Sequence, residues 1–412
     1  MSAVETGVDA VNIRSIQGSV AAPQGFRAAG VACGIKKSGA PDLALIVSDD
    51  EASAAAVFTT NRAQAAPVLV SHEHLAKSGG RARAVVVNSG CANACTGVDG
   101  LAHARAMADL TARAVGCSAS DVLVSSTGVI GVKLDMVKVE AGIVDAGRQL
   151  ARGGGPAAAR AIMTTDPFPK EAAIEAAIGS GIVRVGGIAK GSGMIEPMMA
   201  TMLGFVTTDA RVEPALLQRA LVSVVNDTFN AITVDGECST NDCVFLLASG
   251  ASGVTIGEAE LPSFIQALRA ACEPLAIGIV RGGEGATKLI TVRVIGAQSN
   301  EDARRAARAI ANSPLVKTAV HGGDPNWGRL IAVAGRSGSA FTLEGAAVRI
   351  GPVELFRDGT PFDERSVEAA TYLQGTDIEI EVDLGTGGAG RSHMWTCDLS
   401  AEYVRINAEY RT

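Results

Sequence analysis

The chain contains few aromatic residues, no cluster of basic residues and no long apolar run. Aromatic residues make up 4% of the 412 residues, which argues against a surface that stacks the bases of single-stranded nucleic acid. The net charge of −7 makes nucleic acid and anionic membranes poor candidate partners. No uninterrupted apolar run reaches the roughly 18 residues of a membrane span, and the first residues do not form a signal peptide. We therefore expect a cytoplasmic protein with no nucleic-acid and no membrane partner.

Cysteine motifs for metal binding are also missing. Without an export signal, the eight cysteines are expected to be reduced and to pack as small apolar residues. The pairs Cys91/Cys95 and Cys238/Cys243 lack the two-residue spacing of zinc ligands, and no histidine lies near them in sequence. We expect no metal site and no bound cofactor.

Strand and helix patterns are mixed along the chain, which predicts an α/β or α+β sandwich of sheets and helices. The length favours two lobes, and the obvious division of the sequence falls near residue 200. Apolar, β-branched runs predict strands at 43–50, 83–90, 121–128, 181–187, 244–250, 289–296, 330–335 and 377–385. Helical periodicity predicts helices at 100–116, 136–152, 212–225, 261–272 and 301–312.

The stretch KGSGMIEPMMATML, residues 190–203, places the small hydroxyl residue Thr201 after a glycine-rich segment. A threonine at the start of a chain is an effective nucleophile because its α-amine, with an ordinary pKa of about 8, serves as the base. The same hydroxyl could release that amine by attacking the carbonyl of Ala200 and forming an ester that water hydrolyses. Gly191 and Gly193 would permit the tight backbone that this attack needs. On its own, the Ala-Thr pair favours the ordinary alternative, a loop that enters a buried strand at 201–208.

Seven segments, which occur in order along the chain, decide between the threonine nucleophile and the ordinary loop. The segments are GFRAAGVACGIKKSGAPDLALIVSDD, NSGCANACTG, SSTGVIG, KGSGMIEPMMATML, TVDGECSTNDC, HGGDPNWGR and YVRINAEYRT. With these segments, from about residue 15 to the C-terminus, the chain closely resembles the ornithine acetyltransferase family, the self-cleaving glutamate N-acetyltransferases of the cyclic arginine pathway.

The resemblance implies an autocatalytic cut between Ala200 and Thr201. Residues 1–200 would form an α chain that carries the oxyanion hole, and residues 201–412 a β chain that begins with the nucleophile Thr201. The two chains would stay together, usually as an α2β2 assembly. Thr201 would take acetyl from N-acetylornithine and pass it to glutamate, and some members also use acetyl-CoA as a donor. The implied fold is a sandwich similar in logic to N-terminal-nucleophile hydrolases but distinct in topology.

The resemblance also implies roles for individual residues. Thr127 and Gly128 would form the oxyanion hole. Substrate would be bound, together with Thr201, by Thr164, Lys190, Glu284, Asn407 and Thr412. The chain departs from the family at Met198, where a polar residue is common. This change indicates different packing beside the cleavage loop and leaves the cleavage rate open.

Each residue also has an ordinary explanation. Thr127 and Gly128 follow a predicted strand and could form a simple turn, Lys190 could be solvated, and Glu284 could lie in a flexible glycine-rich loop. The string HGGDPNWGR is more typical of a structural turn near the site than of catalytic residues. TVDGECSTND, with Asp235, Glu237, Asn241 and Asp242, favours a hydrogen-bonded turn network beside the nucleophile over a metal loop. The apolar, strand-like approach to the C-terminus favours a docked chain end.

Two other functions remain open from sequence alone. A self-cleaving aminopeptidase or amidase would use the same nucleophile and send the acyl group to water. A non-enzymatic amino-acid-binding regulator would keep the pocket and lose cleavage, and Met198 is the only support for it. The sequence does not decide whether acetyl-CoA is an efficient donor or whether arginine or ornithine inhibits the protein.

Overall fold

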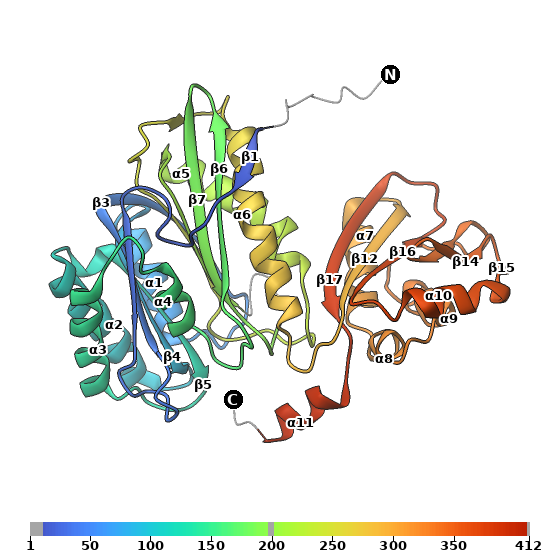
Figure 1. The fold of residues 1–412 in the computed structure, drawn as a ribbon, viewed down its shortest axis with the longest axis horizontal. Helices are drawn as coiled ribbons and strands as arrows, with labels where there is room; N and C mark the ends of the chain where they lie inside the picture. Colours follow the sequence, from blue (N-terminus) through green and yellow to red (C-terminus); the bar gives the residue numbers. More distant parts are fainter. Residues whose placement is uncertain (1–10, 197–201, 410–412) are drawn as a thin grey trace.

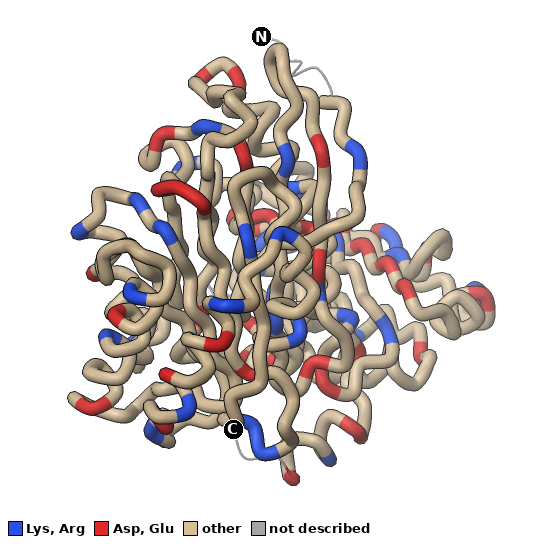
Figure 2. The backbone as a smooth tube through the Cα atoms, turned by 60° about the vertical axis from the view of Figure 1, so that its left-hand side comes forward, with Lys and Arg blue, Asp and Glu red and all other residues tan. Residues whose placement is uncertain are grey.

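The structure, a computed structural model, describes residues 11–196 and 202–409, which form two large β-sheets, covered by helices, and a two-stranded ribbon. The nine-stranded sheet belongs to the first part of the chain, and the six-stranded sheet belongs to the last third (Figure 1). This arrangement confirms the predicted layered α/β fold class. In Figure 2, Lys and Arg residues are interspersed with Asp and Glu residues along the backbone.

The larger sheet is mixed and has the strand order β1-β6-β7-β8-β10-β3-β4-β5, with β2 paired to β3. β8 is parallel to β10 and β4 is parallel to β5, whereas the other neighbours are antiparallel. The strands are β1 Ile13–Ser15, β2 Phe26–Val31, β3 Leu43–Phe58, β4 Arg81–Cys91, β5 Val122–Val129, β6 Lys170–Ile178, β7 Gly181–Lys190, β8 Leu203–Thr208 and β10 Cys243–Ala248. A two-stranded ribbon pairs β9 Arg211–Val212 with β11 Thr255–Ile256.

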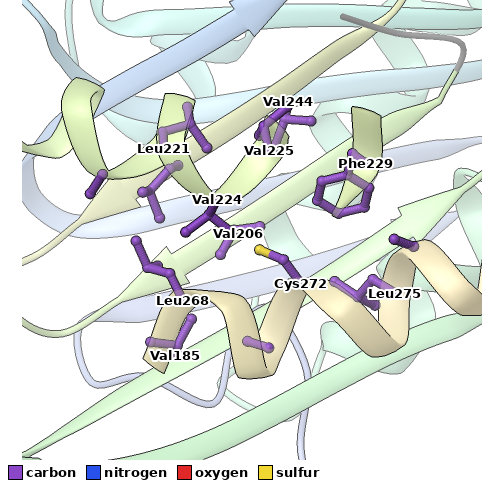
Figure 3. Packing of buried hydrophobic residues seen from close by; sticks show 14 of the residues in the cluster. Val185, Val206, Leu221, Val224, Val225, Phe229, Val244, Leu268, Cys272 and Leu275 are labelled. Atoms are coloured by element: carbon purple, nitrogen blue, oxygen red, sulfur yellow. The ribbon is translucent and has the colours of Figure 1, made fainter. Parts of the chain in front are cut away.

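Helices with one apolar face cover this sheet. α2 and α3 pack against β2 to β5, and α5 and α6 pack against β6, β7, β8 and β10. In Figure 3, apolar side chains of α5 and α6 meet Val185, Val206 and Val244 of the strands. The helices of this lobe are α1 Ala66–Lys77, α2 Gly97–Val115, α3 Met136–Gln149, α4 Gly155–Ala161, α5 Pro214–Asp227 and α6 Leu261–Arg281.

The smaller sheet has the strand order β15-β14-β13-β16-β12-β17. Its strands are β12 Leu289–Ala297, β13 Ala347–Ile350, β14 Val353–Arg357, β15 Thr360–Pro361, β16 Asp377–Asp383 and β17 Gly390–Cys397. Buried side chains of α7 and α9 pack against it and form a separate core. The helices of this lobe are α7 Asn300–Ala311, α8 Pro314–Gly322, α9 Trp327–Gly335 and α10 Ser366–Tyr372, and the terminal helix α11 Ala401–Glu409 lies apart from them (Figure 1).

The helix α6 is long and apolar enough to cross a membrane by length and composition alone. Its buried residues, which include Phe264, Leu268 and Leu275, pack into the core beneath the larger sheet. The structure therefore explains the apolar character of α6 as that of a core helix.

Two predicted strands are helices, and these predictions were wrong. Residues 330–335 lie in α9, where Asn326 caps the helix by accepting a hydrogen bond from the Arg329 N–H. Leu330 and Val333 then fall on its buried face at helical spacing. The approach to the C-terminus is α11, in which Arg405 pairs with carboxylates one turn away on both sides. Short apolar runs carry no periodicity that separates these alternatives.

Residue 200 does not separate two folded lobes. Strands β7 and β8, which flank it in sequence, are antiparallel neighbours in one sheet, and Lys190 pairs with Leu203. The change from the first sheet to the second occurs between α6 and β12 instead. The division into chains 1–200 and 201–412 therefore stays a prediction about cleavage, because it is not a boundary between folding units.

Candidate active site

A cavity of about 150 Å³ lies where several chain segments meet at one end of the larger sheet. Its lining residues come from the end of β5, the end of β7, the start of β8, the loop that precedes β10, the turn after α6, and α11. Its polar lining residues include Thr127, Thr164, Lys190, Asp235, Glu237, Ser239, Asn241, Asp242, Glu284, Tyr403 and Asn407.

The structure brings together all the described residues for which the resemblance implied a role. Thr127, Gly128, Thr164, Lys190, Glu284 and Asn407 line this one cavity. Ala200, Thr201, Met198 and Thr412 lie outside the described residues. In sequence, Thr201 directly precedes Met202, which also lines the cavity.

Lys190 forms the basic side of the cavity. It is the last residue of β7, its exposed fraction is 8%, and its Nζ donates a hydrogen bond to Thr127 Oγ1 at 3.3 Å. Because the Thr127 hydroxyl accepts this bond, its own proton remains available for a group in the cavity. Thr127 and Gly128 lie within the last three residues of β5, so the strand predicted at 121–128 is confirmed and the alternative of a simple turn after the strand is not.

A buried carboxylate, Asp166, organises the backbone beneath Lys190. Its Oδ1 accepts from Lys170 Nζ at 2.5 Å and from the Gly191 N–H at 2.8 Å. Its Oδ2 accepts from the Thr164 N–H at 2.9 Å. Burial raises the pKa of Asp166, but the charges of Lys190 and Lys170 outweigh it and lower the pKa to about 2. Asp166 therefore stays ionised and fixes both Thr164 and the start of the loop after β7.

Two glycines allow backbone segments to approach closely at the cavity. A Cβ on Gly128 would lie 2.4 Å from the backbone carbon of Gly90 on β4, and the φ of Gly128 is +127°. A Cβ on Gly193 would lie 2.3 Å from Glu284 Oε2. Glycine at these positions lets β4 approach β5 and lets the Glu284 carboxylate lie directly on the loop after β7.

Acidic groups also line the cavity. Asp235 accepts hydrogen bonds from the Met194 N–H at 2.7 Å, the Ile195 N–H at 2.8 Å and the Tyr403 hydroxyl at 3.2 Å. Burial, reinforced by the charge of Asp235, raises the pKa of Tyr403, so its hydroxyl stays protonated and donates to Asp235. Met194 has a φ of +58°, an uncommon value outside glycine, so Asp235 holds a sharply bent loop.

The C-terminal helix α11 closes one side of the cavity. Asn407 Nδ2 donates to Glu284 Oε2 at 2.9 Å, while the Glu284 N–H donates to the carbonyl of Ser192 at 2.9 Å. Figure 1 shows α11 apart from the other helices. The expected docked end is thus present as a helix that supplies Asn407 and Tyr403.

The expected turn network over 233–242 contacts Met194 and Ile195 through Asp235. Asp235, Glu237, Asn241 and Asp242 line the cavity. The Asn241 amide donates to the carbonyls of Ala92 at 2.6 Å and Ser126 at 2.9 Å, which joins this loop to the end of β5. Within the described residues, no group of three potential metal ligands is present.

The segment HGGDPNWGR forms a structural turn between α8 and α9, as expected. None of its residues lines the cavity. His321 instead contacts Asp398, with 2.6 Å between Nδ1 and Oδ2.

Three residues that shape the site were missed from the sequence. Asp166 is four residues before Lys170, a spacing that suggests an ion pair, but the sequence does not show that the pair is buried. Tyr403 lines the cavity, and Asp398 is buried and accepts hydrogen bonds from the Thr287 and Lys288 N–H groups. The only signal for these two was their position near the chain end that the resemblance marked.

The chain is similar to proteins of arginine biosynthesis. The model of the ArgJ family matches residues 27–412. The chain is 49% identical over 411 residues to the arginine biosynthesis bifunctional protein ArgJ of Synechococcus sp., and the match covers 97% of this chain and 99% of that protein.

Two solved structures match parts of the chain. The arginine biosynthesis bifunctional protein ArgJ of Bacillus halodurans is 45% identical, with a TM-score of 0.49, and the match covers 51% of this chain and 100% of that one. The ornithine acetyltransferase of Mycobacterium tuberculosis, solved in complex with ornithine, is 42% identical with a TM-score of 0.42. That match covers 46% of this chain and 100% of the other.

Proposed function

The chain belongs to the ArgJ family, and we propose that it moves acetyl from N-acetylornithine to glutamate through an ester on Thr201. It is an acetyltransferase of arginine biosynthesis, a glutamate N-acetyltransferase. The observation that carries the proposal is that Thr127, Gly128, Lys190 and Glu284 line one cavity together with Met202, which follows Thr201 directly in sequence.

The first half-reaction forms an acetyl ester. The α-amine of Thr201 takes the hydroxyl proton while the oxygen attacks the acetyl carbonyl of N-acetylornithine. The Thr127 hydroxyl and the Gly128 N–H would donate to the oxyanion of the tetrahedral intermediate. Collapse of this intermediate breaks the amide bond, and the leaving nitrogen takes the proton from the α-amine, which releases ornithine. In the second half-reaction the amine of glutamate attacks the ester, and the Thr201 hydroxyl is restored.

The charges of the cavity support an amino-acid substrate. Lys190 provides a cation in the cavity lining, whereas Glu284 and Asp235 provide carboxylates. A substrate carboxylate would pair with Lys190, and a substrate ammonium group would face Glu284. Thr164, whose backbone is fixed by Asp166, would add a hydroxyl to the same end as Lys190.

The proposal extends to the donor and the assembly. Acetyl-CoA would serve as a second donor by inserting only its acetyl-thioester end, because a cavity of about 150 Å³ suits a small amino-acid derivative. After self-cleavage, chains 1–200 and 201–412 would remain associated and pair as α2β2. We place this enzyme in the cytoplasm. No bound cofactor is needed for the chemistry.

A test of the function begins with the purified chain, which has a mass of 41.8 kDa before cleavage. We expect two fragments on a denaturing gel and an N-terminal sequence that begins at Thr201. Mass spectrometry after incubation with N-acetylornithine alone should show one acetyl group on the Thr201 fragment. Thr201→Ala should abolish cleavage and transfer, whereas Thr318→Ala, a change of an exposed helix residue, should preserve both.

Two results would contradict the proposal. A Thr201→Ala variant that still splits would exclude Thr201 as the nucleophile. Loss of acetyl from N-acetylornithine at the same rate with and without glutamate would indicate an amidase that sends the acyl group to water.

A further inference from the structure

We propose that Asp398 is a positioning residue that sets the place of Glu284 and of helix α11 on the substrate-binding side of the cavity. The inference rests on the proposed function and concerns a residue that does not line the cavity. It also gives a role to His321 of the HGGDPNWGR segment.

Asp398 is a buried carboxylate with four hydrogen-bond donors. Its exposed fraction is 2%. Oδ1 accepts from the N–H groups of Thr287 and Lys288, both at 2.8 Å. Oδ2 accepts from the Thr287 hydroxyl at 2.6 Å and from His321 Nδ1 at 2.6 Å. Such a set fixes the carboxylate in one orientation and fixes the donors around it.

Asp398 is connected to Glu284 through Thr287 and Lys288, the donors to its carboxylate. Thr287 and Lys288 belong to the turn that follows Glu284 and enters β12. Lys288 Nζ also donates to the carbonyl of Val320 at 2.8 Å, which attaches the turn to α8. Asp398 and the end of α8 therefore hold the turn from which the Glu284 side chain reaches the cavity.

The other side of Asp398 leads to α11. Ser400, two residues further on, donates from its hydroxyl to the carbonyl of Gly285 at 2.6 Å. The helix then begins at Ala401 and carries Tyr403 and Asn407 to the cavity. No described residue of α11 is buried, so apolar packing does not fix the helix. Its position depends on this junction and on the hydrogen bonds that its side chains make.

The two sides meet again in the cavity, where Asn407 donates to Glu284. Asp398, the turn after Glu284 and α11 thus form a closed loop of contacts. Burial raises the pKa of Asp398, but hydrogen bonds from Thr287, His321 and the Lys288 N–H outweigh it and lower the pKa. The carboxylate is therefore ionised when substrate binds.

The test replaces Asp398 by the amide of the same shape and measures substrate use in the cleaved enzyme. Asp398→Asn keeps one side-chain oxygen as an acceptor. It replaces the other oxygen, which accepts from the Thr287 hydroxyl and from His321 Nδ1, by an NH2 group. We expect complete self-cleavage, a KM for N-acetylornithine and a Kd for ornithine raised on the order of tenfold, and a smaller change in kcat. Thr287→Val should have a similar effect, and Thr287→Ser, which keeps the hydroxyl, should restore wild-type binding.

Asp209→Asn provides a matched control. Asp209 is also a buried carboxylate, with an exposed fraction of 1%, and accepts backbone N–H groups from Arg184 at 2.8 Å and Gln24 at 3.2 Å. Asp209 follows the last residue of β8, whereas the cavity lies at the first residue of this strand. Its replacement should lower the melting temperature and leave the KM and the Kd unchanged.

A double-mutant cycle with Glu284→Gln separates positioning from general destabilisation. Because Asp398 acts through Glu284, the effects of Asp398→Asn and Glu284→Gln on the Kd of ornithine should be non-additive. The effects of Asp209→Asn and Glu284→Gln should be additive. Unchanged binding in Asp398→Asn, or additive effects in the cycle, would overturn the inference. Should Asp398→Asn fail to fold, the same cycle with Thr287→Val decides. A wild-type enzyme that binds ornithine but transfers no acetyl would overturn the proposed function alone.

Discussion

Replacing Gly128 by alanine should disable the proposed oxyanion hole by moving two strands apart. The new Cβ would lie 2.4 Å from the Gly90 backbone carbon and 2.6 Å from the Cys91 nitrogen. Carbon atoms prefer separations of about 3.5–4.0 Å, so β4 and β5 must separate by about 1 Å. The φ of +127° adds strain for any residue with a side chain, of about 1–3 kcal/mol.

The displacement falls on the atoms that would stabilise the transition state. A shift of about 1 Å can lower a rate by about 10²-fold, which is also the cost of losing one oxyanion donor. We therefore expect Gly128→Ala to reduce kcat for acetyl transfer by about 10²-fold or more. Self-cleavage should slow as well, because it passes through a similar tetrahedral intermediate.

Gly131→Ala separates the clash from the backbone strain. Gly131 has a φ of +79°, and an added Cβ would meet no atom within 4 Å. Both variants are assayed for kcat, for the time course of cleavage on a gel, and for melting temperature. Gly131→Ala should lose some stability and keep its kcat. Equal kcat values in the two variants would refute the claim that the approach of β4 to β5 shapes the site.

Two further predictions concern the buried ion pair and the chain end. Because the pKa of Asp166 is lowered from 3.8 to about 2 in the folded state, its stabilisation is complete above about pH 4 and is lost as the pH falls toward 2. Asp166→Asn should flatten the pH dependence of the unfolding free energy between pH 5 and 2, measured by urea titration, and an unchanged slope would contradict this. Deletion of residues 407–412 should leave cleavage intact and raise the KM, because α11 buries no side chain in the core but supplies Asn407. A normal KM and kcat, or failure to fold, would remove the binding role of the chain end.

The sequence predicted strands at β3, β4, β5, β7 and β10 of the larger sheet because these runs are apolar and rich in β-branched residues, but it gave no strand at β1, β2 or β6. It failed at 330–335 and at the C-terminus, where short segments gave no clear period and local caps or ion pairs decided for helix. Residues 121–128 were predicted as a strand, with a simple turn at Thr127 and Gly128 as the alternative to an oxyanion hole. In the structure Gly128 continues β5, since β4 approaches too closely for any other residue.

Long-range hydrogen bonds were beyond reach from the sequence. Asp166 acts on Gly191, which is 25 residues away, and Asp398 acts on Thr287, which is 111 residues away. Neither spacing follows from local propensity, because only the fold determines which buried donors need an acceptor. The motifs around Lys190 and Glu284 identified the cavity, but not the groups that hold its walls.

The order of strands explains how the two chains could remain associated after a cut at residue 200. The sheet order β7-β8-β10-β3 places two strands of 201–412 between strands of 1–200. β8 pairs with β7 and β10 pairs with β3, each over six residues. Separating the two chains would therefore break two ladders inside the sheet and expose the core under α5 and α6. Cleavage at this position would leave Lys190 and Thr127 in place, because the sheet that carries them is made from both chains.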